Sequence, residues 1–196
     1  MGIAIVVIGI ALLLLYFWDL RKEKFTTRKI VLIGLFAAIS IVLYMIPFIK
    51  YPQGGGITFF SMLPVMLLGV IYGRREALTC GLIFGFLKII GGGGIINPAE
   101  FLLDYTLSTM VIGLSGMFGT DKKWKIFLGC IVVGFIAAGL NTLSGVLYYA
   151  QYAPKGMNIW VYSILYNYSS TGVEALITSI VMMLLPIKML KERIGK

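Results

Sequence analysis

The chain has 196 residues and a formal net charge of +9, and its composition is 59% hydrophobic but only 13% charged. Soluble domains carry about a quarter charged residues, so this composition predicts a polytopic membrane protein and argues against a soluble enzyme or a nucleic-acid-binding domain. Histidine is absent, which excludes the histidine-dependent zinc, triad and proton-relay chemistries. We expect no metal site, and we interpret Cys80 and Cys130, both in apolar runs, as packing residues.

Seven apolar segments follow one another, at residues 3–18, 29–49, 59–72, 76–91, 99–118, 125–150 and 158–187. We expect each to form a membrane-crossing helix, which predicts an all-α membrane protein. The first segment lacks the basic start and the small-residue cleavage site of a signal peptide, so a retained helix is favoured over a cleaved signal. The chain then divides into an extra N-terminal helix with a basic linker at 1–24 and a six-helix domain at 25–196.

Basic residues accumulate on one side of this predicted topology. Fourteen of the seventeen lie there: Arg21, Lys22, Lys24, Arg28, Lys29, Arg74, Arg75, Lys122, Lys123, Lys125, Lys188, Lys191, Arg193 and Lys196. By the positive-inside rule this side is cytoplasmic. The sequence therefore predicts a multi-pass protein of the cell membrane with its C-terminus inside and its N-terminus outside.

The first predicted outer loop reads Tyr51-Pro-Gln-Gly-Gly-Gly-Ile57. Glycine permits backbone conformations that other residues avoid. The residues Gln53, Gly54, Gly55 and Gly56 are candidates for a mobile lid over an outward-facing pocket. A simple turn between two helices is the alternative, and it is at least as good an interpretation of the second glycine-rich loop, Gly91–Pro98.

Asp104 is the most informative residue of the apolar segments. A carboxylate within a membrane helix costs a few kcal/mol and usually faces a cavity, a partner or a ligand. At 1.5 Å per residue it lies roughly 8 Å below the outer end of its helix. Polar and aromatic residues of the last two segments share this depth, namely Asn141, Tyr148, Tyr149, Tyr162, Tyr166 and Asn167. We favour a small-molecule pocket over an interfacial aromatic belt or polar contacts between helices.

Glu174 falls about midway along the last segment, below the proposed pocket. It is interpreted as a protonated carboxyl, a partner of a neighbouring Ser or Thr, or a contact to another subunit, and not as a ligand-binding residue. The sequence has no glycine–lysine phosphate-binding motif and no nucleophile–histidine pair. An enzyme is therefore not expected.

Several short motifs occur in order and with similar spacings in one known family. They are Pro52-Gln-Gly-Gly-Gly-Ile-Thr58, Ser61-Met-Leu-Pro64, Leu103-Asp-Tyr105, Gly113-Leu-Ser-Gly116, Gly145-Val-Leu-Tyr-Tyr149, Tyr152-Ala-Pro-Lys-Gly156 and Tyr162-Ser-Ile-Leu-Tyr-Asn167. Together they resemble the thiamine-specific membrane subunits, or S components, of energy-coupling factor (ECF) importers, the ThiT or YuaJ family. The resemblance covers residues from about Thr27 to Met189.

This resemblance implies a six-helix S-component core that binds thiamine with high affinity near the outer face, plus the extra helix. It implies no catalysis and no cofactor, because partner ATPases would use the ATP. The partners would be a transmembrane coupling protein and two cytoplasmic ATPases. Carried over by position, the substrate-binding residues would be Asp104, Tyr105, Asn141, Tyr149, Tyr162 and Asn167. Gly34 and Ala38 would form a small-residue face toward the coupling protein.

The chain departs from the family at two positions. Asn141 stands where the family usually has a histidine, and Ala137 where an arginine is expected. Asp104 is then expected to be the only charged side chain of the pocket. The alternative ligand is a thiamine precursor, a thiamine analogue or another small heterocyclic vitamin. The alternatives of other classes are a stand-alone proton-coupled vitamin transporter that uses Glu174 and a non-transporting structural protein.

Overall fold

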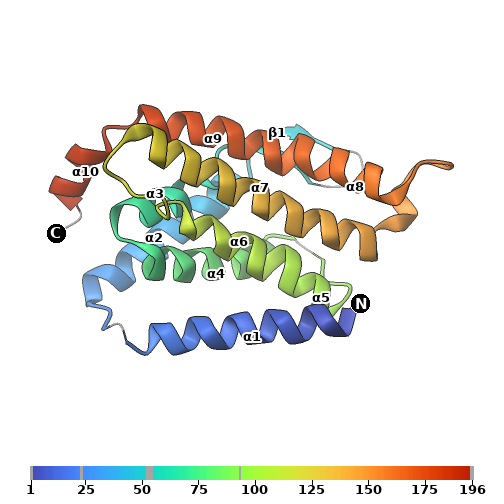
Figure 1. Ribbon diagram of the computed structural model, residues 1–196, viewed down its shortest axis with the longest axis horizontal. Coiled ribbons are helices and arrows are strands. Elements are labelled where there is room, and N and C mark those ends of the chain that lie inside the picture. The colour runs from blue at the N-terminus through green and yellow to red at the C-terminus, as the bar shows by residue number, and fades with distance from the viewer. Residues whose placement is uncertain (1, 23, 52–54, 93, 195–196) are drawn as a thin grey trace.

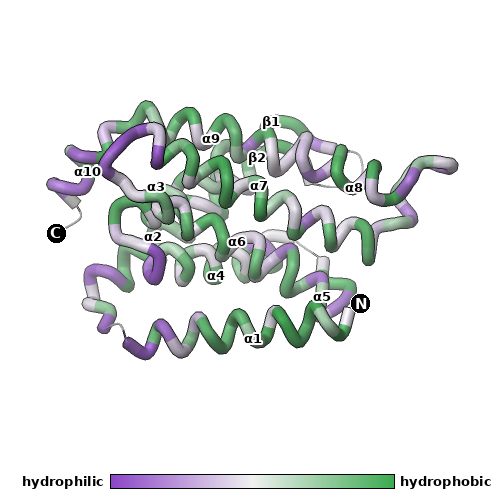
Figure 2. Tube along the Cα trace, in the orientation of Figure 1, coloured by the Kyte–Doolittle hydropathy of each residue, from purple (hydrophilic) through white to green (hydrophobic). Residues whose placement is uncertain are grey.

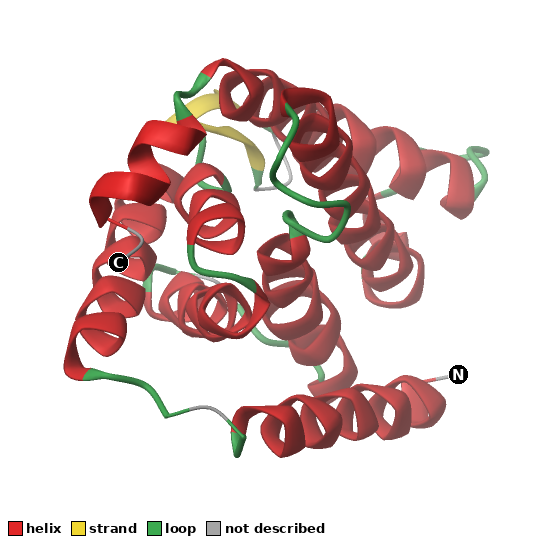
Figure 3. Ribbon diagram, turned by 60° about the vertical axis from the view of Figure 1, so that its left-hand side comes forward, coloured by secondary structure: helices red, strands yellow, loops and turns green. Residues whose placement is uncertain are grey.

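The computed structural model describes the chain except residues 1, 23, 52–54, 93 and 195–196. Its described part is a bundle of helices with one small hairpin (Figures 1 and 3). The helices of the first half are α1 (Gly2–Leu20), α2 (Thr27–Tyr44), α3 (Leu63–Ile71) and α4 (Arg74–Ile90). The hairpin strands β1 (Pro47–Lys50) and β2 (Gly56–Thr58) pair antiparallel between α2 and α3.

The second half contains two π-helical segments. A helical run begins at α5 (Pro98–Glu100) and continues through the π-helical η1 (Phe101–Leu107), α6 (Ser108–Val111) and the 3-10 turn η2 (Ile112–Leu114). The long α7 (Lys123–Tyr148) follows and ends in the turn η3 (Ala150–Tyr152). The last run comprises α8 (Ile159–Asn167), the π-helical η4 (Tyr168–Gly172), α9 (Val173–Leu184) and the short α10 (Ile187–Ile194). Such π-helical segments are rare in proteins, and those that occur are often found at functional sites.

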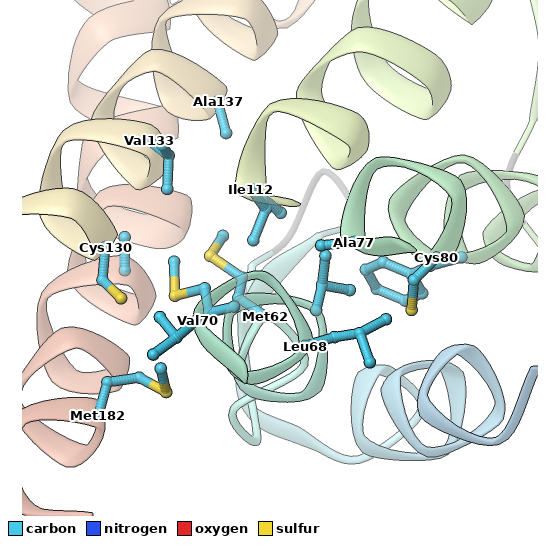
Figure 4. Packing of buried hydrophobic residues seen from close by; sticks show 14 of the residues in the cluster. Met62, Leu68, Val70, Ala77, Cys80, Ile112, Cys130, Val133, Ala137 and Met182 are labelled. Atoms are coloured by element: carbon cyan, nitrogen blue, oxygen red, sulfur yellow. The ribbon is translucent and has the colours of Figure 1, made fainter. Parts of the chain in front are cut away.

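The bundle packs around the short helix α3. Almost every residue of α3 is buried, as expected for a helix that is apolar on all sides. Figure 4 shows Leu68 and Val70 of α3 between side chains of α4 on one side and of α7 and α9 on the other. Cys80 and Cys130 are both free and buried in this core, which confirms their predicted packing role.

Helix α4 approaches η1 and the following α6 with backbone in direct contact. A methyl group on Gly85 of α4 would overlap the carbonyl oxygen of Tyr105, and one on Gly81 would overlap that of Thr109. Only glycine permits this approach. The contact fixes η1, which carries Asp104, against the first half of the bundle.

The extra helix α1 lies along one flank of the bundle, beside α5 and η1 (Figure 1). Gly9 packs against Leu102, and the Tyr16 hydroxyl is 2.7 Å from the Thr79 hydroxyl oxygen. At its C-terminal end, Asp19 accepts hydrogen bonds from Arg75 at 2.9 and 3.0 Å. The other face of α1 is apolar and exposed.

The basic segments meet at one end of the bundle, where hydrophilic residues gather in Figure 2. Asp19 at the end of α1 contacts α4 at its first turn through Arg75. Lys29 near the start of α2 forms a 2.6 Å ion pair with Glu76 of the same turn. The Lys191 ammonium of α10 donates to the Thr120 hydroxyl just before α7.

Three of the described helices, α1, α2 and α7, are long and apolar enough to cross a membrane. The run from α8 to α9, taken with α10 across a 71° bend, adds a fourth. The other predicted segments form shorter or broken helices, such as the nine-residue α3. The mostly helical fold is therefore observed, and the count of six helices plus one stays a prediction.

The predicted helix at 29–49 was too long. It ends at Tyr44, and residues from Pro47 onward form strand β1. Proline lacks the amide hydrogen that would continue a helix and disfavours helical geometry at the preceding residue. The segment is apolar on both sides of this break, so hydrophobicity alone did not indicate it. A hairpin therefore lies where a helix and a loop were predicted.

Candidate functional site

The described part of the chain encloses a cavity of about 590 Å³. Its lining residues come from α2, the hairpin, α4, η1 and the run from α7 to α9. All six residues predicted to bind substrate line it: Asp104, Tyr105, Asn141, Tyr149, Tyr162 and Asn167. Two of the predicted lid residues, Gly55 and Gly56, also line it, while Gln53 and Gly54 lie outside the described residues.

Asp104 lies on η1, and its carboxylate is only half satisfied. Its Oδ2 accepts a hydrogen bond of 2.7 Å from the Ser144 hydroxyl of α7. Its Oδ1 is buried and has no hydrogen-bond partner among the described residues. A buried carboxylate oxygen without a donor is costly, because the group has lost its water. A ligand with hydrogen-bond donors or positive charge would satisfy it.

Asn141 of α7 shows the same deficiency. Its amide nitrogen donates to the Thr171 hydroxyl of η4 at 3.4 Å. Its carbonyl oxygen is buried and has no donor within the described part of the chain. Two acceptor oxygens from different helices therefore line one cavity without a donor from the described residues, which favours a ligand with several N–H or O–H groups.

Tyrosine rings form a large part of the cavity wall. Tyr149 and Tyr152 stack with ring centroids 6.1 Å apart, and Tyr162 and Tyr166 lie 5.9 Å apart at 37°. The Tyr105 hydroxyl donates to the carbonyl oxygen of Gly94. Exposed ring faces bind flat rings and cations.

Glu100 positions Tyr149 and was not identified from the sequence. Its side chain is fully buried. Its Oε1 accepts a 2.5 Å hydrogen bond from the Tyr149 hydroxyl, and its Oε2 accepts from the backbone amides of Ile96 and Asn97. The pattern Asn97-Pro-Ala-Glu100 is a capping box and could have predicted the helix start. Nothing in it indicated the contact with Tyr149.

Glu174 lines the cavity, contrary to its predicted place below the pocket. Its Oε2 accepts from the Thr58 hydroxyl at 2.7 Å and from the Thr58 amide at 3.3 Å, and its Oε1 accepts from the Ser61 hydroxyl at 2.8 Å. One of the predicted alternatives, a bond to Ser or Thr of a neighbouring segment, is therefore observed. These contacts hold the end of strand β2 against α9.

The hairpin is also fastened at its other strand. The Tyr51 hydroxyl, just after β1, donates to the Ser169 hydroxyl oxygen at 3.1 Å, and its ring meets Tyr166 edge-on. The backbone of Gly56 has a φ of +134°, which favours glycine. The described residues on either side of 52–54 thus contact η4 and α9, and Gly55, Gly56 and Thr58 line one side of the cavity.

Asp104 is not the only charged residue of the cavity. Lys88 in the last turn of α4 and Glu174 also line it. Sequence analysis did not identify Lys88 as a cavity residue, because it lies close to the end of the apolar segment at 76–91. Two carboxylates and one ammonium give the described lining a formal charge of −1, which suits a monocation.

Gly34 and Ala38 lie one turn apart on the exposed face of α2, outside the cavity. No other part of the described chain lies within 4 Å of a methyl group placed on Gly34. The neighbouring Val31, Leu35 and Ile39 are exposed as well. This face is apolar and exposed within the described chain.

Comparison with known proteins gives consistent matches. The model of one protein family, described as thiamine transporter protein (Thia_YuaJ), matches residues 30–194. The thiamine transporter ThiT of Bacillus subtilis (strain 168) is 30% identical over 172 residues, covering 80% of this chain and 89% of that protein. A second ThiT, from Lacticaseibacillus paracasei, is 29% identical over 138 residues, covering 62% of this chain and 69% of that protein.

A solved structure of ThiT from Listeria monocytogenes has a similar fold. The TM-score is 0.72, and the match covers 85% of this chain and 96% of that chain. The sequences are 23% identical, so this likeness shows the fold alone.

Proposed function

The chain belongs to the thiamine transporter protein (Thia_YuaJ) family, and we propose on that premise that it binds thiamine as the S component of an ECF importer. The observation that carries the proposal is the pair of unsatisfied acceptor oxygens, Oδ1 of Asp104 and Oδ1 of Asn141, in one tyrosine-lined cavity. It is a membrane protein of a transporter family, and we expect no catalysis and no resident cofactor.

Thiamine matches the chemistry of this cavity. Its aminopyrimidine carries an amino group with two N–H donors, and its thiazolium carries a fixed positive charge. Asp104 offers an unpaired carboxylate oxygen, and the formal charge of the described lining suits one positive charge. The rings of Tyr105, Tyr149 and Tyr162 are available for stacking, each with a cation–π contribution of about 0.5–2 kcal/mol when desolvated. The cavity volume of about 590 Å³ falls within the usual range for small-molecule sites.

We propose that the hairpin is the lid of this cavity and that the cavity opens toward the outside. The hairpin contributes Gly55 and Gly56 to the lining, and the basic ends of the helices lie at the other end of the bundle. The positive-inside rule assigns that basic end to the cytoplasm. The C-terminus would then be cytoplasmic and the N-terminus outside.

We also propose that the exposed face around Gly34 and Ala38 binds the transmembrane coupling protein, which in turn binds two cytoplasmic ATPases. Small residues permit close helix packing within a membrane. Co-purification of the coupling protein with a Gly34→Leu variant tests this contact. We expect the complex to be lost while thiamine binding persists, and an intact complex would refute the assignment.

Isothermal titration of the purified protein in detergent with thiamine is the direct test of the ligand. We expect saturable 1:1 binding at submicromolar thiamine. Absence of binding at micromolar thiamine would refute the proposal. Tighter binding of the isolated hydroxymethyl-aminopyrimidine would instead identify a thiamine precursor as the ligand.

A further inference from the structure

The ammonium group of Lys88 is a cation that belongs to the cavity lining itself. Its Nζ lies 4.9 Å from the ring centroid of Tyr44, 5.6 Å from that of Tyr105 and 5.9 Å from that of Phe84. These distances are within the about 6 Å over which ring faces attract cations. The three rings come from α2, η1 and α4, so they surround one position in the cavity wall.

Lys88 does not use the carboxylates of the cavity directly. Within the described chain it has no carboxylate oxygen at ion-pair distance, and the Oδ1 of Asp104 has no partner. The other carboxylate, Glu174, accepts three hydrogen bonds from Thr58 and Ser61. An ammonium group and a carboxylate oxygen of the described chain thus share one cavity without forming an ion pair. The aromatic ring faces are the contacts that offset the desolvation cost of the Lys88 ammonium group.

We propose that Lys88 is the resident cation of the unliganded cavity and that a cationic ligand takes its place in front of Tyr44 and Tyr105. The proposal rests on the proposed function. Two positive charges in one poorly solvated cavity repel each other. A lysine has a flexible stem of four carbons, so its ammonium group has room to leave the ring faces. Lys88 would therefore oppose the binding of a cation and have little effect on a neutral molecule of the same shape.

If Lys88 instead bound the ligand directly, its removal would change the affinity in the opposite direction. If Lys88 donated a hydrogen bond to the ligand, removing it would weaken binding of every ligand that keeps the accepting atom. A comparison of thiamine with its neutral thiophene analogue, which lacks the thiazolium charge, separates the two roles. The Lys88→Met variant keeps most of the side-chain volume and removes the charge.

The experiment is isothermal titration of wild type, Lys88→Met and Lys88→Arg with both ligands. Lys155→Met is the matched control, because Lys155 is exposed in the loop before α8 and lies outside the cavity. We expect Lys88→Met to bind thiamine about tenfold more tightly, equivalent to about 1.4 kcal/mol. Binding of the neutral analogue should change by less than about twofold, and Lys88→Arg should resemble wild type.

A second readout is thermal unfolding without ligand. Lys88→Met should melt at a lower temperature than Lys155→Met, because the unliganded cavity loses its counter-charge, and thiamine should raise its melting temperature more than that of wild type. Should Lys88→Met not fold, Lys88→Gln replaces it with the same expectations.

The outcomes separate the two proposals. Weaker thiamine binding by Lys88→Met, or an equal change for both ligands, would overturn the resident-cation role while leaving thiamine binding intact. Failure of the wild-type protein to bind thiamine would overturn the proposed function, and with it this inference.

Discussion

The substitution Asp104→Asn tests the proposed site most directly. Asparagine keeps the shape of the side chain and an oxygen that accepts from Ser144, but it removes the negative charge. A hydrogen bond to a charged group contributes about 1.5–3 kcal/mol. Since about 1.4 kcal/mol corresponds to a tenfold change, thiamine affinity should fall by about ten- to a hundredfold. Asp104→Ala, which also leaves the Ser144 hydroxyl without its acceptor, should lose at least tenfold.

The assay is isothermal titration with thiamine and with its neutral thiophene analogue. Asp121→Asn is the control, because Asp121 is exposed, pairs with Lys125 in the first turn of α7 and does not line the cavity. The neutral analogue should lose less affinity than thiamine, since the charge term is absent. Equal thiamine affinity in wild type and Asp104→Asn would show that Asp104 does not bind the ligand, and equal losses for both ligands would refute the argument from charge.

Three further substitutions test the lid, the wall and the packing. Glu174→Gln keeps one acceptor oxygen but weakens the contact of the hairpin with α9. The association and dissociation rates of thiamine should therefore both rise in stopped-flow measurements, while Kd stays within about threefold of wild type. Unchanged rates would contradict the lid role. Tyr149→Phe leaves the Oε1 of Glu100 without its donor and should destabilise the protein by about 1–3 kcal/mol in denaturant titration, whereas wild-type stability would show that this bond is dispensable. Gly85→Ala should lower the melting temperature strongly and Gly34→Ala should not, and similar melting of the two would disprove the backbone contact of α4 with η1.

The sequence predicted which residues line the cavity better than it predicted where the surrounding helices begin and end. Asp104, Asn141 and Asn167 are polar residues in apolar helices. Placing such side chains in lipid costs free energy, so their presence indicates a cavity or a partner. Counting residues along straight helices placed them at one depth, and the structure has them in one cavity. Their role in ligand binding stays a prediction.

Sequence analysis misplaced Glu174 and did not identify Lys88, in both cases for physical reasons. The depth of a residue along its helix does not show which other segments contact it. Glu174 accepts hydrogen bonds from Thr58 at the end of β2 and from Ser61 between β2 and α3. A lysine near a helix end usually reaches toward water at the interface. Lys88 instead turns toward rings of two other elements, and no local pattern encodes those contacts.

Glu100 illustrates a different limit. The capping box explains one of its two carboxylate oxygens from the sequence alone. The other oxygen bonds Tyr149, which is 49 positions away. This hydrogen bond depends on how α5 crosses the end of α7, and no local sequence pattern encodes that crossing.

The backbone contact between α4 and η1 has a consequence for how selectivity could change over evolution. Where two main chains touch at Gly81 and Gly85, no side chain is present to be exchanged, and any enlargement separates the helices. The cavity is lined by replaceable side chains, such as Lys88, Asn141 and Tyr162. New specificities would therefore arise from exchange of side chains that face the cavity, while the spacing of α4 and η1 stays constant.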